Sequence, residues 1–265
     1  MMRRHRGRLF TALAPFVAGS AFLLVWEIAV RRAGIPPYIL PTPSLIAATL
    51  VRDHALLASS LLFTLSVTLA ALAAAVVGGG LLAILCAQSR MLEGILFPLA
   101  VVLQVTPIVA IAPLIIIWVN NPLIALLICA WIVAFFPILA NTTQGLNSVD
   151  HNLQALFTLY GANRWQTLWY LRLPSALPHF LTGLRISGGL ALIGAVVGEF
   201  VSATGGRETG LAYRIMEAGY RLDIARMFAA LVLISLTGIA IFAALSTLSW
   251  LLLRHWHDSA TKDED

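Results

Sequence analysis

The chain has 265 residues, of which 60% are hydrophobic and 11% are charged, and its formal net charge at pH 7 is +5. Soluble domains carry about 25% charged residues, so this composition excludes a soluble globular protein. The apolar blocks reach the roughly 20 residues that a helix needs to cross a bilayer, which predicts an all-α polytopic membrane protein. Arginines beside such spans are typical of interfacial anchoring, so the basic charge does not indicate nucleic-acid binding.

Six apolar blocks predict six transmembrane helices joined by polar or proline-rich segments. An even number of spans places both termini on one side, and the basic start (Arg3, Arg4, Arg6 and Arg8) favours the cytoplasm for that side. Residues 202–226, which are polar and glycine-rich, are then periplasmic. The expected spans cover approximately residues 9–30, 56–86, 95–119, 122–140, 177–201 and 227–253.

The third expected span contains three prolines, Pro98, Pro107 and Pro113. Breaks in a helix at membrane depth are tolerated only against protein or a water-filled cavity. We therefore expect a translocation pathway beside this span. The candidate pathway residues are polar or aromatic side chains in this span and in the fourth and fifth spans: Gln104, Thr106, Trp131, Phe135 and Glu199.

Residues 150–174, between the fourth and fifth spans, predict two short amphipathic helices that meet at a bend, and we call this segment the elbow. Asp150 is suited to cap the first helix, and Gly161 is suited to end it in a left-handed conformation. One face of this helix carries apolar side chains at the i, i+3, i+4, i+7 spacing, namely Leu153, Leu156, Phe157 and Tyr160.

The second helix of the elbow is predicted to begin directly after the bend. Asn163 and Gln166 have the spacing of a capping box, and Pro174 predicts the end of the helix. A pair of amphipathic helices inside a membrane protein indicates a surface on which a soluble partner docks. The apolar stripe of this second helix consists of Trp165, Leu168 and Trp169.

The elbow resembles a loop found in the membrane subunits of bacterial ABC importers. Gly161, followed after nine residues by the run Leu171 to Pro174, is similar to the glycine and the (Ile/Leu)-x-Leu-Pro of that loop. The stretches GANRWQTLW, LPSALPHFLTGLRI and PYILPTPS are similar to the nitrate, sulfonate and taurine branch of these permeases. The resemblance implies a type I ABC importer permease fold with a cytoplasmic coupling-helix elbow. The implied ATPase-docking residues are Leu156, Phe157, Tyr160, Gly161, Ala162, Asn163, Arg164, Trp165 and Pro174.

The elbow also departs from the pattern of that family. A Glu-Ala-Ala triplet is expected to begin six residues before the glycine, and the sequence reads Ala155, Leu156 and Phe157 there. The carboxylate that could form a salt bridge with the ATPase is absent. We therefore expect docking through shape and apolar contact, with Arg164 as the polar remainder.

The resemblance implies a mechanism of alternating access. A second copy of the chain would complete the pathway, two cytosolic ATPase subunits would bind ATP and Mg, and a periplasmic substrate-binding protein would deliver the ligand. The location implied is the bacterial inner membrane, with several spans and both termini cytoplasmic. The sequence contains neither a Walker-type GxxxxGK[ST] loop nor a His or Cys cluster, so we expect no enzyme activity, cofactor or metal site in this chain.

Two questions stay open at the level of sequence. The branch resemblance implies a small polar solute such as nitrate, a sulfonate or taurine, but importers of pyrimidines or vitamin precursors have similar sequences. A stand-alone secondary transporter would need intramembrane charges for ion coupling, and the spans offer little beyond Glu27, Arg185 and Glu199. A membrane-embedded enzyme is disfavoured because no catalytic constellation is visible.

Overall fold

A computed structural model of the chain describes residues 2–202 and 209–254, with the side chains of residues 2–13 and 16 outside the description. Within the described part, all regular secondary structure is helical. The helices are α1 (Met2–Arg32), α2 (Pro43–Arg52), α3 (His54–Gln88), α4 (Arg90–Val105), α5 (Ile108–Trp118), α6 (Pro122–Asn147), α7 (His151–Leu159), α8 (Arg164–Thr167), the π-helical turn η1 (Leu168–Arg172), α9 (Leu173–Ser202), α10 (Leu211–Tyr220) and α11 (Ile224–Leu253).

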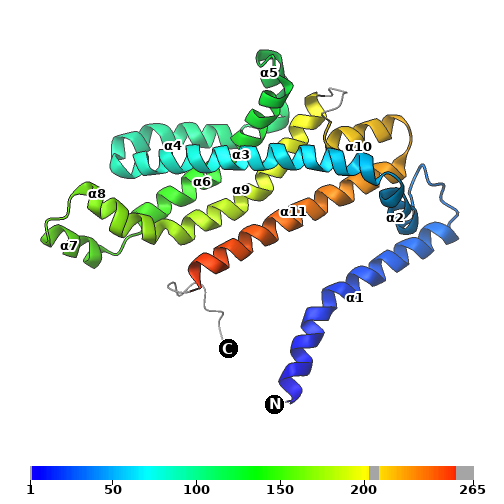
Figure 1. Cartoon of the computed structure of the whole chain (residues 1–265), viewed down its shortest axis with the longest axis horizontal. Helices are drawn as coiled ribbons and strands as arrows, with labels where there is room; N and C mark the ends of the chain where they lie inside the picture. Colours follow the sequence, from blue (N-terminus) through cyan, green and yellow to red (C-terminus); the bar gives the residue numbers. More distant parts are fainter. Residues whose placement is uncertain (1, 203–208, 255–265) are drawn as a thin grey trace.

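The long helices α3, α6, α9 and α11 run along the length of the molecule (Figure 1). In the described residues, four helices are long and apolar enough to cross a membrane: α3, α6, α11 and the continuous run Arg164–Ser202, which includes α9. A fifth span is present if α4 and α5 are counted together. The first expected span, residues 9–30, falls in α1 and partly outside the described side chains. This first span therefore stays a prediction.

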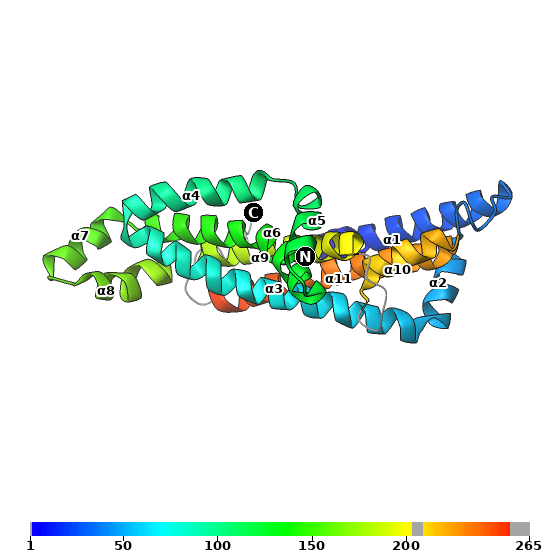
Figure 2. The same cartoon turned by 90° about the horizontal axis from the view of Figure 1, so that it is seen from above.

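The break in the third expected span lies at one proline. Helices α4 and α5 are bent by 100° between Val105 and Ile108, so the sequence signal at Pro107 is confirmed. Pro98 and Pro113 lie inside α4 and α5, and the helices continue past them. Seen from above, α4 lies along the bundle and the chain then turns sharply into α5 (Figure 2).

The interface between α6 and α9 is built from small residues. A Cβ added to Gly183 would lie 2.6 Å from the Pro137 carbonyl oxygen, and one added to Gly194 would lie 2.7 Å from the Cα of Ala130. Ser187 closes the contact by donating a 2.6 Å hydrogen bond to the Ala134 carbonyl. Side chains of this size let two membrane helices approach closely, so dispersion contacts hold them together. Because α6 leads into the elbow and α9 leads out of it, this pair anchors the elbow firmly.

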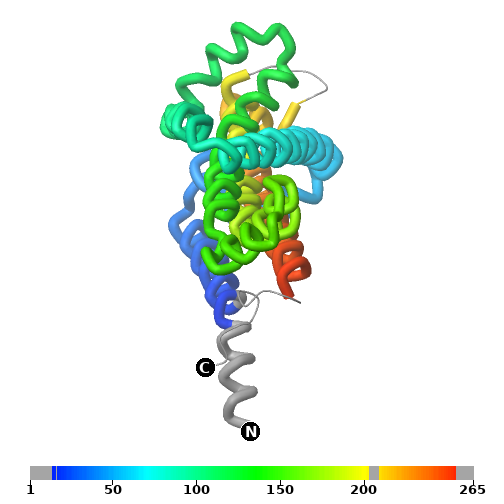
Figure 3. Tube along the Cα trace, turned by 90° about the vertical axis from the view of Figure 1, so that its left-hand side faces the viewer, coloured from blue at the N-terminus to red at the C-terminus, as the bar shows by residue number. Residues whose placement is uncertain are grey.

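The two ends of the bundle carry different structures. Helices α7 and α8 project from one end, and α2 and α10 lie at the other (Figure 1). Viewed from the elbow end, the turns of α7 and α8 stand at the front of the long helices (Figure 3). The expected elbow and the segment expected to be periplasmic are therefore at opposite ends of the molecule. The side of the membrane on which each end lies stays a prediction.

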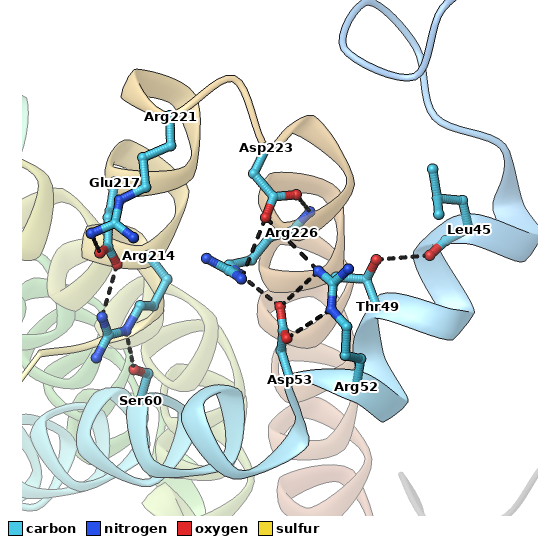
Figure 4. Close-up of polar contacts among 10 residues, drawn as sticks. All are labelled: Leu45, Thr49, Arg52, Asp53, Ser60, Arg214, Glu217, Arg221, Asp223 and Arg226. Atoms are coloured by element: carbon cyan, nitrogen blue, oxygen red, sulfur yellow. Dashed lines mark hydrogen bonds and ion pairs between the residues drawn. The ribbon is translucent and has the colours of Figure 1, made fainter.

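Two clusters of charged and polar side chains link α2, α3, α10 and α11 at the end that lacks the elbow (Figure 4). Arg226 in α11 donates to Asp53, between α2 and α3, over 2.7 Å. Asp53 also accepts from Arg52 at 3.0 Å. Nearby, Arg214 in α10 bonds to Ser60 of α3 at 3.0 Å and pairs with Glu217 at 2.8 Å. These contacts fix α10 and α2 against the long helices.

Candidate functional site: the elbow and the Glu199 clasp

The first helix of the elbow, α7, begins as its sequence predicts. The Asp150 side chain accepts hydrogen bonds from the amides of Asn152 at 2.7 Å and Leu153 at 3.4 Å. These bonds satisfy amides that have no partner within the helix, and the carboxylate also faces the positive end of the helix dipole. The expected N-cap at Asp150 is confirmed.

The bend of the elbow is a Schellman turn around Gly161. The Gly161 amide donates to the Thr158 carbonyl, and the Ala162 amide donates to the Phe157 carbonyl, both at 3.0 Å. Gly161 has φ +71°, a conformation that a Cβ makes costly. The predicted left-handed end of the helix is confirmed.

The second helix starts with the predicted capping box. The Asn163 side chain accepts from the Gln166 amide, and the Gln166 side chain accepts from the Asn163 amide, each at 2.8 Å. The Schellman turn that ends α7 and the capping box that begins α8 fix the angle between the two helices. The elbow is thus defined by local bonds before any partner binds.

The expectation that Pro174 ends the second helix was wrong. The helix continues through η1 into α9, and Pro174 lies inside it. In η1 the Leu173 amide bonds to the Leu168 carbonyl, five residues earlier. This wider π turn shifts the carbonyl that a proline ring would otherwise strike, so the helix passes the proline. The elbow is therefore joined to the fifth span without a break.

The apolar side chains of the elbow point outward. Tyr160 is 82% exposed and Trp165 is 68% exposed, and Leu156 and Trp169 are exposed as well. Leu168 is the exception in the predicted stripe, since it is buried against the bundle. A groove of about 380 Å³ runs over this surface, lined by Leu156, Phe157, Tyr160, Ala162, Gln166 and Tyr170. Exposed aromatic residues beside a groove are typical of protein interfaces.

The structure places the five candidate pathway residues in three separate regions. Gln104 and Thr106 lie at the α4–α5 bend, where Gln104 is exposed and the Thr106 hydroxyl donates to the Val102 carbonyl at 2.7 Å. Trp131 and Phe135 in α6 contact each other, with ring centroids 4.8 Å apart and ring planes tilted by 40°, and they pack beside Gly78 of α3. In the described residues, no hydrogen bond joins either of them to Glu199. Their role in a pathway stays a prediction.

Glu199 is the buried centre of a cluster of hydrogen bonds that the sequence did not predict. We call this cluster, formed by Glu199, Thr64 and the amides of Leu211 and Ala212, the Glu199 clasp. Glu199 is 2% exposed, and its carboxylate accepts from the Thr64 hydroxyl of α3 at 2.8 Å and from the Ala212 amide of α10 at 3.0 Å. The Thr64 oxygen accepts in turn from the Leu211 amide at 2.9 Å. The clasp therefore ties α3, α9 and the start of α10 together. Thr209 and Gly210, directly before α10, were the sequence signal for a helix start there.

Comparison with known proteins decides the family. The profile of the family described as "Binding-protein-dependent transport system inner membrane component" matches residues 79–259. The chain belongs to this family of ABC importer permeases. The permease shares its fold with the crystal structure of an amino acid ABC transporter with histidines, at a TM-score of 0.62 and 19% identity, over 78% of this chain and 97% of that one. The expected type I permease fold is confirmed.

Curated relatives of the permease carry the names of different substrates. It is 35% identical to the formylaminopyrimidine transport permease protein ThiX of Halalkalibacterium halodurans over 93% of this chain and 97% of that protein. It is 36% identical to the riboflavin transport system permease protein RibX of Chloroflexus aurantiacus, over 94% and 91%. It is 30% identical to the taurine transport system permease protein TauC of Escherichia coli, over 89% and 84%. The predicted resemblance to importer permeases is confirmed.

Proposed function

We propose that the permease is the membrane subunit of an ATP-driven importer and that its elbow is the coupling element that docks on a cytosolic ATPase. Two copies would enclose the pathway, two ATPase subunits would bind ATP and Mg, and a periplasmic binding protein would deliver the solute. The ATPase subunits would hydrolyse ATP, and the permease itself would form the pathway for the solute. The location we propose is the bacterial inner membrane, with both termini in the cytoplasm.

The observation that carries this proposal is the continuity of the elbow with a span. Helix α8, η1 and α9 form one unbroken run, Arg164–Ser202, which ends at the Glu199 clasp. A displacement of the exposed elbow is therefore passed along a single helix to the opposite end of the bundle. The tight α6–α9 contact at Gly183 and Gly194 keeps the two helices on either side of the elbow moving together.

We propose a pyrimidine or a vitamin precursor as the substrate class. The support is that the relatives named for formylaminopyrimidine and riboflavin have higher identities and coverage than the relative named for taurine. A small sulfonate, nitrate or taurine is the alternative. Binding of candidate ligands to the cognate binding protein separates the two classes.

A matched pair of substitutions tests the docking role. Tyr160, at the end of α7, and Tyr220, at the end of α10, are 82% and 84% exposed. The two helices lie at opposite ends of the molecule (Figure 1). We expect Tyr160→Asp to reduce co-purification of the ATPase subunit with the permease and Tyr220→Asp to leave it unchanged. Membrane insertion of both variants is checked by fractionation. Equal recovery of the ATPase with both variants would overturn the proposal.

A further inference from the structure

A second cavity lies beside the elbow, on its polar side. It has a volume of about 330 Å³ and lies between the end of α3, helix α7 and the start of the α8–η1 run. It shares Ala162 with the apolar groove, so one partner could cover both. Its lining consists of Ala87, Gln88, Gln154, Thr158, Ala162, Arg164, Thr167 and Arg172.

The charge of this cavity is positive. Arg164 and Arg172 contribute two guanidinium groups, and no carboxylate is among the lining residues. Arg172 is half-buried and uses one nitrogen, Nη1, in a 2.9 Å hydrogen bond to the Ala87 carbonyl. Arg164 is exposed, and within the described residues it has neither an ion pair nor a side-chain hydrogen bond. A guanidinium group offers five donors, so most of the donors in the cavity are unused.

The hydroxyl groups of the cavity cannot compete as donors. Thr158 donates its hydroxyl to the Gln154 carbonyl at 2.9 Å, and Thr167 donates to the Asn163 carbonyl at 3.1 Å. An entering group therefore finds the guanidinium donors of Arg164 and Arg172 beside the amides of Gln88 and Gln154, and a group rich in acceptors matches them best. A carboxylate fits because its two oxygens match the guanidinium fork.

We propose that this cavity receives an acidic side chain, aspartate or glutamate, of the docked ATPase. The inference rests on the proposed function, and it names the polar contact of that docking site. In a loop with a Glu-Ala-Ala triplet, the permease supplies the carboxylate of such a contact. Here the permease would supply the arginines and the ATPase would supply the carboxylate. The neighbouring groove, with exposed Tyr160 and Tyr170, favours a protein as the occupant over an ion alone.

The test uses charge reversal with a matched control. Arg164→Glu is compared with Arg164→Lys and with Arg90→Glu, since Arg90 is an exposed arginine at the same end of the bundle and outside the cavity. Affinity for the ATPase that co-purifies with the intact permease is measured in nanodiscs of neutral lipid. We expect Arg164→Glu to weaken binding by about tenfold or more and Arg90→Glu to stay within about threefold of the wild type. Arg164→Lys should fall between them, because it keeps the charge and loses the fork. The acidic residue of the ATPase is then found by an Asp/Glu→Arg scan that restores binding to Arg164→Glu.

Tyr160→Asp separates the two proposals. If Tyr160→Asp abolishes binding and Arg164→Glu does not weaken it, the acidic contact is wrong and the docking role stands. If neither variant changes binding, the docking role fails as well. A loss that appears only when anionic lipid or inorganic phosphate is present would assign the cavity to a headgroup or a free anion, and it would overturn the acidic side chain.

Discussion

The hydroxyl of Thr64 in α3 donates a 2.8 Å hydrogen bond to the carboxylate of Glu199 in α9, and 135 positions of sequence separate the two residues. The same carboxylate accepts from the Ala212 amide, so helix α10 cannot leave the bundle without exposing a buried acid. Unpaired buried carboxylates are costly, so this clasp holds the end of the permease that is opposite the elbow.

The fit of the clasp predicts a strong effect at Gly210. A Cβ at this position would collide with the Glu199 carboxylate. We expect Gly210→Ala to lower the free energy of unfolding by about 1–3 kcal/mol, because the clasp must open to admit the methyl group. The control is Gly219→Ala, also near α10, where an added Cβ meets nothing within 4 Å. Thermal unfolding in detergent compares the two, and equal midpoints would contradict a close fit.

The contact between α6 and α9 predicts a similar contrast within one helix. Gly183→Ala places a Cβ 2.6 Å from the Pro137 carbonyl oxygen, whereas Gly189→Ala places one in open space. We expect the first to destabilise the permease by about 1–3 kcal/mol and the second to have little effect. The same thermal measurement applies. A larger loss with Gly189→Ala would mean that α6 and α9 do not pack as described.

The elbow needs glycine at position 161 because of its backbone conformation and not because a side chain would lack room. No atom lies within 4 Å of an added Cβ, but φ is +71°. Alanine in the left-handed region costs roughly 1–2 kcal/mol, so we expect Gly161→Ala to weaken ATPase binding by about tenfold. Gly161→Asn should lose less, because asparagine tolerates this region better. Equilibrium binding measurements rank the two variants by their affinity for the ATPase. A lower affinity for Gly161→Asn than for Gly161→Ala would contradict this explanation.

The charged cluster around Asp53, at the end that lacks the elbow, predicts a pH dependence. The hydrogen bond from Arg52, followed by that from Arg226, lowers the pKa of Asp53 from 3.8 to about 2. The lowered pKa stabilises the fold above pH 3.8, and this stabilisation is lost as the pH falls from there through about 2. We expect Asp53→Asn to be less stable at neutral pH and to lose less stability over that acid range. Parallel pH profiles for the two proteins would show that Asp53 does not titrate as described.

Sequence reasoning succeeded where structure depends on neighbouring residues. Asp150, Gly161 and the Asn163–Gln166 box follow local rules of helix capping, and each was predicted. Pro174 was misjudged because the π turn that accommodates it is not visible in the composition. Proline alone did not distinguish the break at Pro107 from the continuous helices at Pro98 and Pro113.

Contacts between distant parts of the chain were not predicted. The Thr64–Glu199 bond and the Asp53–Arg226 bond join residues 135 and 173 positions apart. No local pattern states which of the buried or interfacial charges will meet. The glycines of α9 were visible in the sequence, but the helix that packs against them was not. Small residues allow another helix to approach closely, and they do not indicate which helix it is. The candidate site was therefore predicted at the elbow and missed at the clasp.

Site-specific photo-crosslinking in intact cells tests the central claim, that the elbow contacts a cytosolic ATPase. A photoreactive amino acid replaces Trp165 in the elbow or Tyr38 in the exposed turn between α1 and α2 at the other end. We expect irradiation to join the ATPase subunit to the permease from position 165 and not from position 38. Capture of the ATPase from position 38, or of an extracytoplasmic protein from position 165, would contradict the account.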